Sequence, residues 1–212
     1  MSKNLKKIGF GIPLFLIGAL GLVIMTKRGP AEKGAVLSRK QLIDAKRSCE
    51  RIWDEANAPN RESFYFGKNP SGEWKPLAKD APEDEPNEIA TVLLESKRPI
   101  GLTLSIGDMG AGDQTSYHIY CYSPTGRLTT YVSDFRTFHG HVRAVDTVVI
   151  LPLKEAPQSM REYYDLQSKR PLDAEPSDWN DNSEDLSALF PDSQALITVF
   201  PLIRGHSPIS RQ

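Results

Sequence analysis

Residues 8–25 read IGFGIPLFLIGALGLVIM, eighteen consecutive residues without a charged side chain. A helix rises about 1.5 Å per residue, so this segment would span roughly 27 Å, close to the ~30 Å hydrocarbon core of a bilayer. Basic side chains flank both ends of the segment: Lys3, Lys6, Lys7, Lys27 and Arg28. Such side chains can reach the two membrane interfaces. We therefore expect a single transmembrane helix at residues 8–25 that anchors the chain in a membrane.

Two other interpretations of this segment are a cleaved signal peptide and a buried helix of a soluble domain. A cleaved signal peptide also begins with a basic tail, but its apolar region is usually about 7–15 residues long and ends in a small-x-small cleavage pattern, which is missing here. A buried helix of a soluble domain agrees poorly with the basic flanks and the N-terminal position. The positive charges on the two sides of the segment are nearly balanced. We expect the short N-terminal tail to lie in the cytoplasm and the following domain to be extracytoplasmic.

Outward from the anchor, the sequence divides into regions of different composition. We expect a basic N-terminal tail at residues 1–7, a linker at 26–36, one soluble α+β domain at 37–204 and a flexible tail at 205–212. The first 28 residues hold five of the 26 basic residues and none of the 27 acidic ones. The remainder therefore carries 21 basic against 27 acidic residues, a net charge of about −6. An acidic domain is a poor partner for nucleic acid, which requires a basic surface.

The first element expected in the soluble domain is an amphipathic helix from Ser38 to about residue 56. Ser38 and Gln41 have the spacing of a capping box, in which each side chain bonds the backbone of the other residue. Apolar or small residues recur at helical spacing on one face: Leu42, Ala45, Cys49, Ile52 and Ala56. Charged residues occupy most of the opposite face, and we expect the apolar face to cover a sheet.

From residue 63 onward the pattern is mostly that of β-strands separated by turns. Residues 63–66 and 73–77 are expected to form a hairpin, and 101–106, 116–122, 127–138, 142–151 and 195–203 to be strands. Residues 88–96 and 160–166 fit either a strand or a short helix. Loops are expected at 79–88, 107–115 and 173–185, the first and last of which are acidic. The sum is an α+β domain, with a helix packed on a mainly antiparallel sheet whose middle is the hairpin of 116–122 and 127–138.

The chain contains two cysteines, Cys49 and Cys121. Two cysteines are too few for a disulfide framework or for a zinc site made of cysteines. One disulfide between them and two buried free thiols both remain open, because cysteine also packs as a small apolar residue.

Three histidines are the strongest candidates for a metal site. His139 and His141 form an H-x-H pair, and His118 lies on the preceding strand. Three imidazoles can hold zinc and leave a position for water, and Asp134 or Asp146 could add a carboxylate. The competing interpretation is that His139 and His141 are partly solvated turn residues.

No recognised catalytic or dinucleotide-binding motif occurs in the sequence, and no cofactor other than the alternative zinc ion is implied. We expect a non-catalytic, membrane-anchored domain that binds or assembles with a membrane or envelope protein. A metal-dependent hydrolase using His118, His139 and His141 is the first alternative. The second alternative is a domain that binds a small apolar ligand. Aromatic residues of the central hairpin could line its groove or simply form the core: Tyr117, Tyr120, Tyr122, Tyr131, Phe135 and Phe138.

Overall fold

The computed structural model describes residues 36–77, 86, 88–107, 114–151, 156–179 and 181–206. For residues 205 and 206 it describes the backbone only. The expected transmembrane helix at 8–25, most of the linker and most of the C-terminal tail lie outside the described residues. Within the described part of the chain, no helix is both long enough and apolar enough to cross a membrane.

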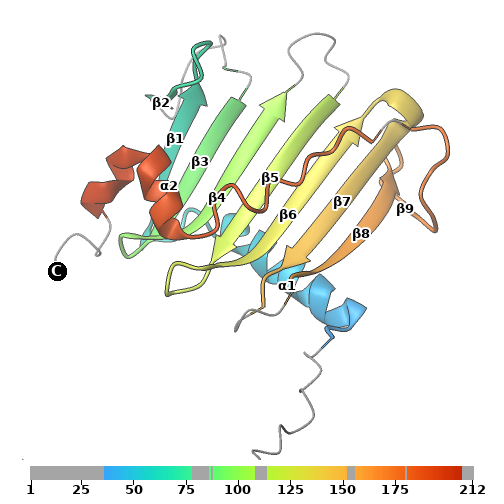
Figure 1. Cartoon of the computed structure of the whole chain (residues 1–212), viewed down its shortest axis with the longest axis horizontal. Helices are drawn as coiled ribbons and strands as arrows, with labels where there is room; N and C mark the ends of the chain where they lie inside the picture. Colours follow the sequence, from blue (N-terminus) through green and yellow to red (C-terminus); the bar gives the residue numbers. More distant parts are fainter. Residues whose placement is uncertain are drawn as a thin grey trace, which may run out of the picture. The chain divides into compact units, whose positions relative to one another are not determined.

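A single antiparallel sheet dominates the fold (Figure 1). In the described residues it has nine strands, in the order β2-β1-β3-β4-β5-β6-β7-β8-β9. Their bounds are β1 Arg61–Lys68, β2 Trp74–Leu77, β3 Glu88–Glu95, β4 Arg98–Gly107, β5 Gln114–Tyr122, β6 Leu128–Thr137, β7 Val142–Val149, β8 Gln158–Asp165 and β9 Pro171–Leu172. The β5–β6 hairpin lies in the middle of the sheet, as its sequence predicted. The two ambiguous segments, 88–96 and 160–166, are strands.

Helix α1 (Arg39–Asp54) packs on one face of the sheet, against β4 to β8. Ser38 is its N-cap, and the predicted capping box is present, with the Gln41 backbone N–H donating to Ser38 Oγ and the Gln41 side chain bonding the Ser38 backbone. Leu42 and Cys49 are the buried members of its apolar face. The predicted arrangement of an amphipathic helix on an antiparallel sheet is confirmed.

Cys49 and Cys121 form a disulfide that ties α1 to β5. Their Cα atoms are 5.6 Å apart, within the range that a disulfide requires. Both residues are buried. Of the two possibilities that the sequence left open, the structure shows the disulfide.

The opposite face of the sheet is covered by the C-terminal part of the chain. Residues 173–179 and 181–192, which we call the strap, run across this face from β9 to helix α2 (Ser193–Val199), and a 3₁₀ helix, η2 (Pro201–His206), follows (Figure 1). Side chains from α2 and η2 complete the main core between this cover and the sheet: Leu196, Ile197, Phe200 and Ile203. The acidic segment 173–185 is irregular, as expected, but it covers the sheet.

The expected strand at 195–203 is wrong, because this segment is helical in the structure. Asp192 caps α2, its side chain accepting a hydrogen bond of 2.9 Å from the Ala195 backbone N–H. The buried residues of the segment follow a helical spacing, with Leu196, Phe200 and Ile203 each fully buried. Ile197, Thr198 and Val199 favour strands locally, but burial of one helical face against the sheet outweighs this preference.

Candidate functional site

The register of four neighbouring strands places a row of polar side chains under the strap. His118 of β5 pairs with Ser133 of β6, Ser133 pairs with Asp146 of β7, and Asp146 pairs with Arg161 of β8. Directly paired residues of antiparallel strands point to the same face of a sheet, so these four side chains share the face that the strap covers. We call these four residues the polar row.

The strap is held over this row by hydrogen bonds and aromatic contacts. The Tyr120 hydroxyl donates to the Leu186 carbonyl at 2.8 Å, and the Leu186 backbone N–H donates to the Tyr131 hydroxyl at 3.1 Å. Arg161 binds Asp181 of the strap, and Trp179 packs edge-on against Tyr163. These contacts hold the strap against the sheet, so that it covers the polar row.

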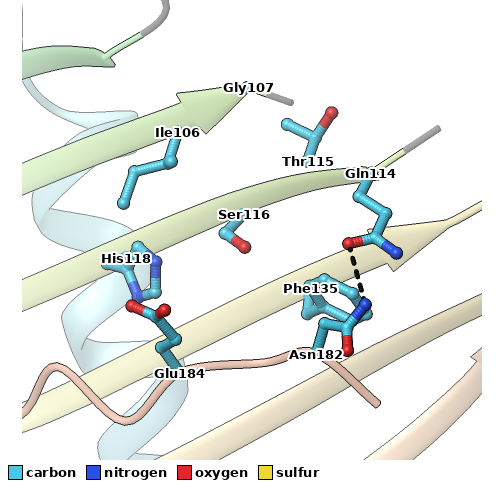
Figure 2. Close-up of a pocket in the computed structure, with 9 residues that line it drawn as sticks. All are labelled: Ile106, Gly107, Gln114, Thr115, Ser116, His118, Phe135, Asn182 and Glu184. Carbon is cyan, nitrogen blue, oxygen red and sulfur yellow. Dashed lines mark hydrogen bonds between the residues drawn. The ribbon is translucent and has the colours of Figure 1, made fainter. Parts of the chain in front are cut away.

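Two cavities remain between the strap and the sheet. The first has a volume of about 240 Å³, and Figure 2 shows its lining, with Ile106, Ser116 and His118 on the sheet side. Asn182 and Glu184 enter it from the strap, and the Glu184 carboxylate points toward the His118 ring (Figure 2). The Asn182 side-chain amide donates to Gln114 Oε1 at 3.4 Å.

The second cavity adjoins the first, because Glu184 lines both. It has a volume of about 210 Å³ and contains Ser133, Asp146 and Arg161 of the polar row together with Asp185 of the strap. Each cavity is large enough for several water molecules or for one small polar group, at about 30 Å³ per water. Hydroxyl, carboxylate and amide groups line these cavities beside apolar side chains such as Ile106, Phe135 and Val148, so the cavities suit a small ligand that carries both polar and apolar groups.

His118 is a neutral, buried group at the boundary of the first cavity. Burial lowers the pKa of His118 to about 4, although the negative charge of Asp185 acts in the opposite direction. Its Nδ1 lies 2.8 Å from the Tyr131 hydroxyl, which already accepts the Leu186 N–H. The Tyr131 hydroxyl can donate either to Nδ1 or to the Glu184 carbonyl at 3.5 Å, so both imidazole tautomers are compatible with this arrangement. His118 lines the first cavity, where its ring can hydrogen-bond a molecule as donor or as acceptor according to the tautomer.

Ser133 lies in register between a histidine and an aspartate, but the three do not form a catalytic relay. The Ser133 hydroxyl is buried and has no hydrogen-bond partner among the described residues. The nearby basic nitrogen, Nδ1 of His118, is engaged by Tyr131, and Asp146 is bound by Arg161 through two contacts of 2.6 Å. A nucleophilic serine needs a base in hydrogen-bond contact and a group that orients that base. The arrangement therefore fits binding better than nucleophilic catalysis.

The structure does not bring the three histidines of the expected metal site together. His118 is buried in β5, whereas His139 and His141 lie in an exposed 3₁₀ turn, η1 (His139–His141), after β6. His118 pairs with Ser133, four residues before the end of β6 at Thr137, which alone corresponds to roughly 13 Å along the strand. No group of three or more His, Cys, Asp or Glu residues suited to a metal ion occurs in the part of the chain that the structure describes.

The two carboxylates considered for that site have other partners. Asp134 points to the α1 side of the sheet, where Arg136 and Arg143 each donate two hydrogen bonds to it. Burial disfavours its ionised form, but these hydrogen bonds prevail and lower the pKa of Asp134 below its ordinary value. Asp146 binds Arg161 on the strap side. Neither carboxylate is available to complete a site with the histidines.

The aromatic residues of the central hairpin are mainly core. Tyr120, Tyr122, Tyr131 and Phe135 are buried, whereas Tyr117 and Phe138 are exposed. Sequence reasoning missed Ser133, Glu184 and Asp185, because their proximity depends on strand register and on the path of the strap.

Comparison of the chain with models of protein families, with curated proteins and with solved structures gave no match. The functional argument therefore depends on the geometry described above.

Proposed function

We propose that this protein is a membrane-anchored, non-catalytic binding domain that works outside the cytoplasm with a membrane or envelope protein partner. The observation that carries the proposal is the Cys49–Cys121 disulfide in a domain that follows a long apolar segment. Disulfides form and persist in oxidising compartments and are rare in the cytosol. A signal-anchor at residues 8–25 would deliver the domain to such a compartment and keep it at the membrane surface.

The arrangement of the polar row supports a binding role. His118, Ser133 and Asp146 are in register, but Nδ1 of His118 is engaged by Tyr131 and Asp146 by Arg161, so neither activates the Ser133 hydroxyl. The disulfide, α1 and the strap hold the sheet from both faces, which gives a rigid framework for recognition. Rigid frameworks reduce the entropy lost on binding.

The location can be tested in cells that produce the full-length protein. Free thiols would be blocked with a small alkylating reagent before lysis, and thiols released by reduction would then be labelled with a heavy maleimide. We expect both cysteines to be labelled only after reduction, and externally added protease to digest the domain in cells whose cytoplasm stays sealed. Free thiols together with resistance to protease would contradict the extracytoplasmic location.

The partner can be tested by purifying the tagged full-length protein in mild detergent and identifying the proteins that elute with it. The matched control is the same chain with residues 8–25 replaced by an unrelated transmembrane helix, which keeps the location of the domain. We expect one membrane or envelope protein at fixed stoichiometry with both chains. A lone protein in both preparations would contradict a binding or assembly role toward a protein partner.

A further inference from the structure

A buried polar side chain lines each of the two cavities beneath the strap, and one of them has no protein partner. His118 and Ser133 are each only 1% exposed. Within the described residues, Oγ of Ser133 has no hydrogen-bond partner, whereas His118 bonds the Tyr131 hydroxyl through Nδ1. A buried polar group without a partner destabilises the ligand-free protein, and a bound ligand can remove this penalty by hydrogen bonding. Both groups line cavities that meet at Glu184.

The charge of the cavities is negative. Arg161 is the one cationic side chain among their lining residues, and Asp146 and Asp181 already bind its guanidinium. Glu184 and Asp185 make no ion pair within the part of the chain that the structure describes. His118 adds no positive charge at neutral pH, because burial holds its pKa near 4. Glu184 and Asp185 are both exposed residues on the strap side of the cavities, and two neighbouring carboxylates without a cationic partner favour a positively charged ligand.

The chemistry of the remaining lining favours an organic cation over a metal ion. The described residues contain no group of three carboxylates, histidines or cysteines suited to a metal. The other polar groups, the His118 ring and the hydroxyls of Ser116 and Ser133, are donors or acceptors suited to ligand hydroxyl groups. Ile106 and Phe135 supply apolar contacts for a small carbon skeleton.

We propose that these cavities bind a small hydroxylated amine, with its ammonium group at Glu184 and Asp185 and its hydroxyl groups at His118 and Ser133. Amino sugars and amino alcohols belong to this chemical class. The proposal goes beyond the membrane-anchored binding role and does not depend on it, because every residue involved lies within the folded domain.

The test uses the full-length protein in detergent, with its histidine rings labelled with ¹⁵N, and follows the ring signals of His118 by NMR. His118→Gln assigns the signal. The probes are glucosamine and ethanolamine, each compared with its uncharged counterpart, glucose or ethylene glycol, at the same concentration and pH. We expect the two amines to shift the His118 signals in a saturable way and the uncharged compounds to leave them unchanged. No shift with either amine, or equal shifts with the uncharged compounds, would overturn the proposal.

Variants then locate the binding by calorimetry with whichever amine shifts His118. Glu184→Gln combined with Asp185→Asn removes both free carboxylates without a large change in volume. We expect the dissociation constant to rise roughly tenfold to a hundredfold, the usual range for losing charge-assisted hydrogen bonds. Glu62→Gln, an exposed carboxylate change on β1, is the matched control and should leave the dissociation constant unchanged. Equal affinity of the double variant and wild type would overturn the assigned site, as would saturation by calcium or zinc chloride in place of the amines.

Discussion

Cys49 of helix α1 and Cys121 of central strand β5 are joined by a disulfide across 72 residues of sequence. The bond therefore encloses β1 to β4 in a covalent loop and fixes the helix on the middle of the sheet. Because a cross-link restricts the unfolded chain more than the folded one, its loop length sets the size of its contribution to stability.

Replacing both cysteines by alanine should lower the free energy of unfolding by roughly 4 kcal/mol, as expected for a loop of this length. Urea denaturation of the full-length protein in detergent measures the change. A reducing agent should destabilise the wild type by a similar amount and leave the double variant unaffected. If the reducing agent changed neither protein, the bond would not contribute to stability.

Acidification should destabilise the protein through His118. Its pKa is about 4 in the folded state and near 6.5 when unfolded, so the unfolded state binds a proton first as the pH falls. The free energy of unfolding is therefore highest above pH ~6.5 and falls progressively toward pH 4, by up to roughly 3 kcal/mol. Denaturation curves of wild type and His118→Gln between pH 7.5 and 4.5 should converge as the pH falls. Parallel curves across this range would contradict a neutral, buried His118.

Removing the Ser133 hydroxyl should not destabilise the ligand-free protein, although Ser133 is buried in the sheet. Its Oγ has no hydrogen-bond partner among the described residues, so Ser133→Ala removes a polar group that burial already disfavours. We expect the free energy of unfolding to stay the same or to rise by about 1 kcal/mol. Thr130→Ala in the same strand tests whether loss of any buried hydroxyl has this effect. A loss of more than about 1 kcal/mol in Ser133→Ala would show that Oγ bonds the protein.

The elements that sequence predicted well have local signals. Ser38 and Gln41 marked the start of α1, and the short break between 116–122 and 127–138 marked the β5–β6 turn, in which the Gly126 N–H bonds the Ser123 carbonyl at 2.8 Å. The candidate site has no such signal. His118, Ser133 and Glu184 come together only because β5 and β6 pair in one register and a distant segment crosses them, and a single sequence specifies neither the register nor that path. Helix α2 was missed for a related reason, since Ile197 and Val199 favour strands until the packing of Phe200 is known.

Asp134 should stabilise the α1 side of the sheet through its two arginines. Asp134→Asn leaves Arg136 and Arg143 without their shared carboxylate, and we expect a loss of about 2 kcal/mol, less than for a fully buried pair because both arginines are partly exposed. The pKa of Asp134 is lowered in the folded state, so its contribution is present above pH ~4 and declines only as the pH falls through that lower value. Denaturation at pH 7 measures the loss. The exposed Asp44→Asn in α1 should change stability by less than about 0.5 kcal/mol, and an equal effect of both variants would contradict the assigned role.

The cover formed by α2 and η2 should depend on Phe200 more than on any neighbour in sequence. Phe200 is fully buried, and its ring lies 4.7 Å from that of Phe66 and 5.4 Å from that of Trp74, measured between centroids. Phe200→Ala should lower the free energy of unfolding by about 3–5 kcal/mol, the range for deleting a large buried ring. Val199→Ala is the matched control, because Val199 precedes Phe200 in the chain and is 39% exposed, so the loss of stability should stay below about 1 kcal/mol.

Because Phe200 also packs against Phe190 of the strap, Phe200→Ala should speed amide hydrogen exchange in the strap as well as in α2. Faster exchange confined to α2 would show that the strap is held by its hydrogen bonds to Tyr120 and Tyr131 independently of this core.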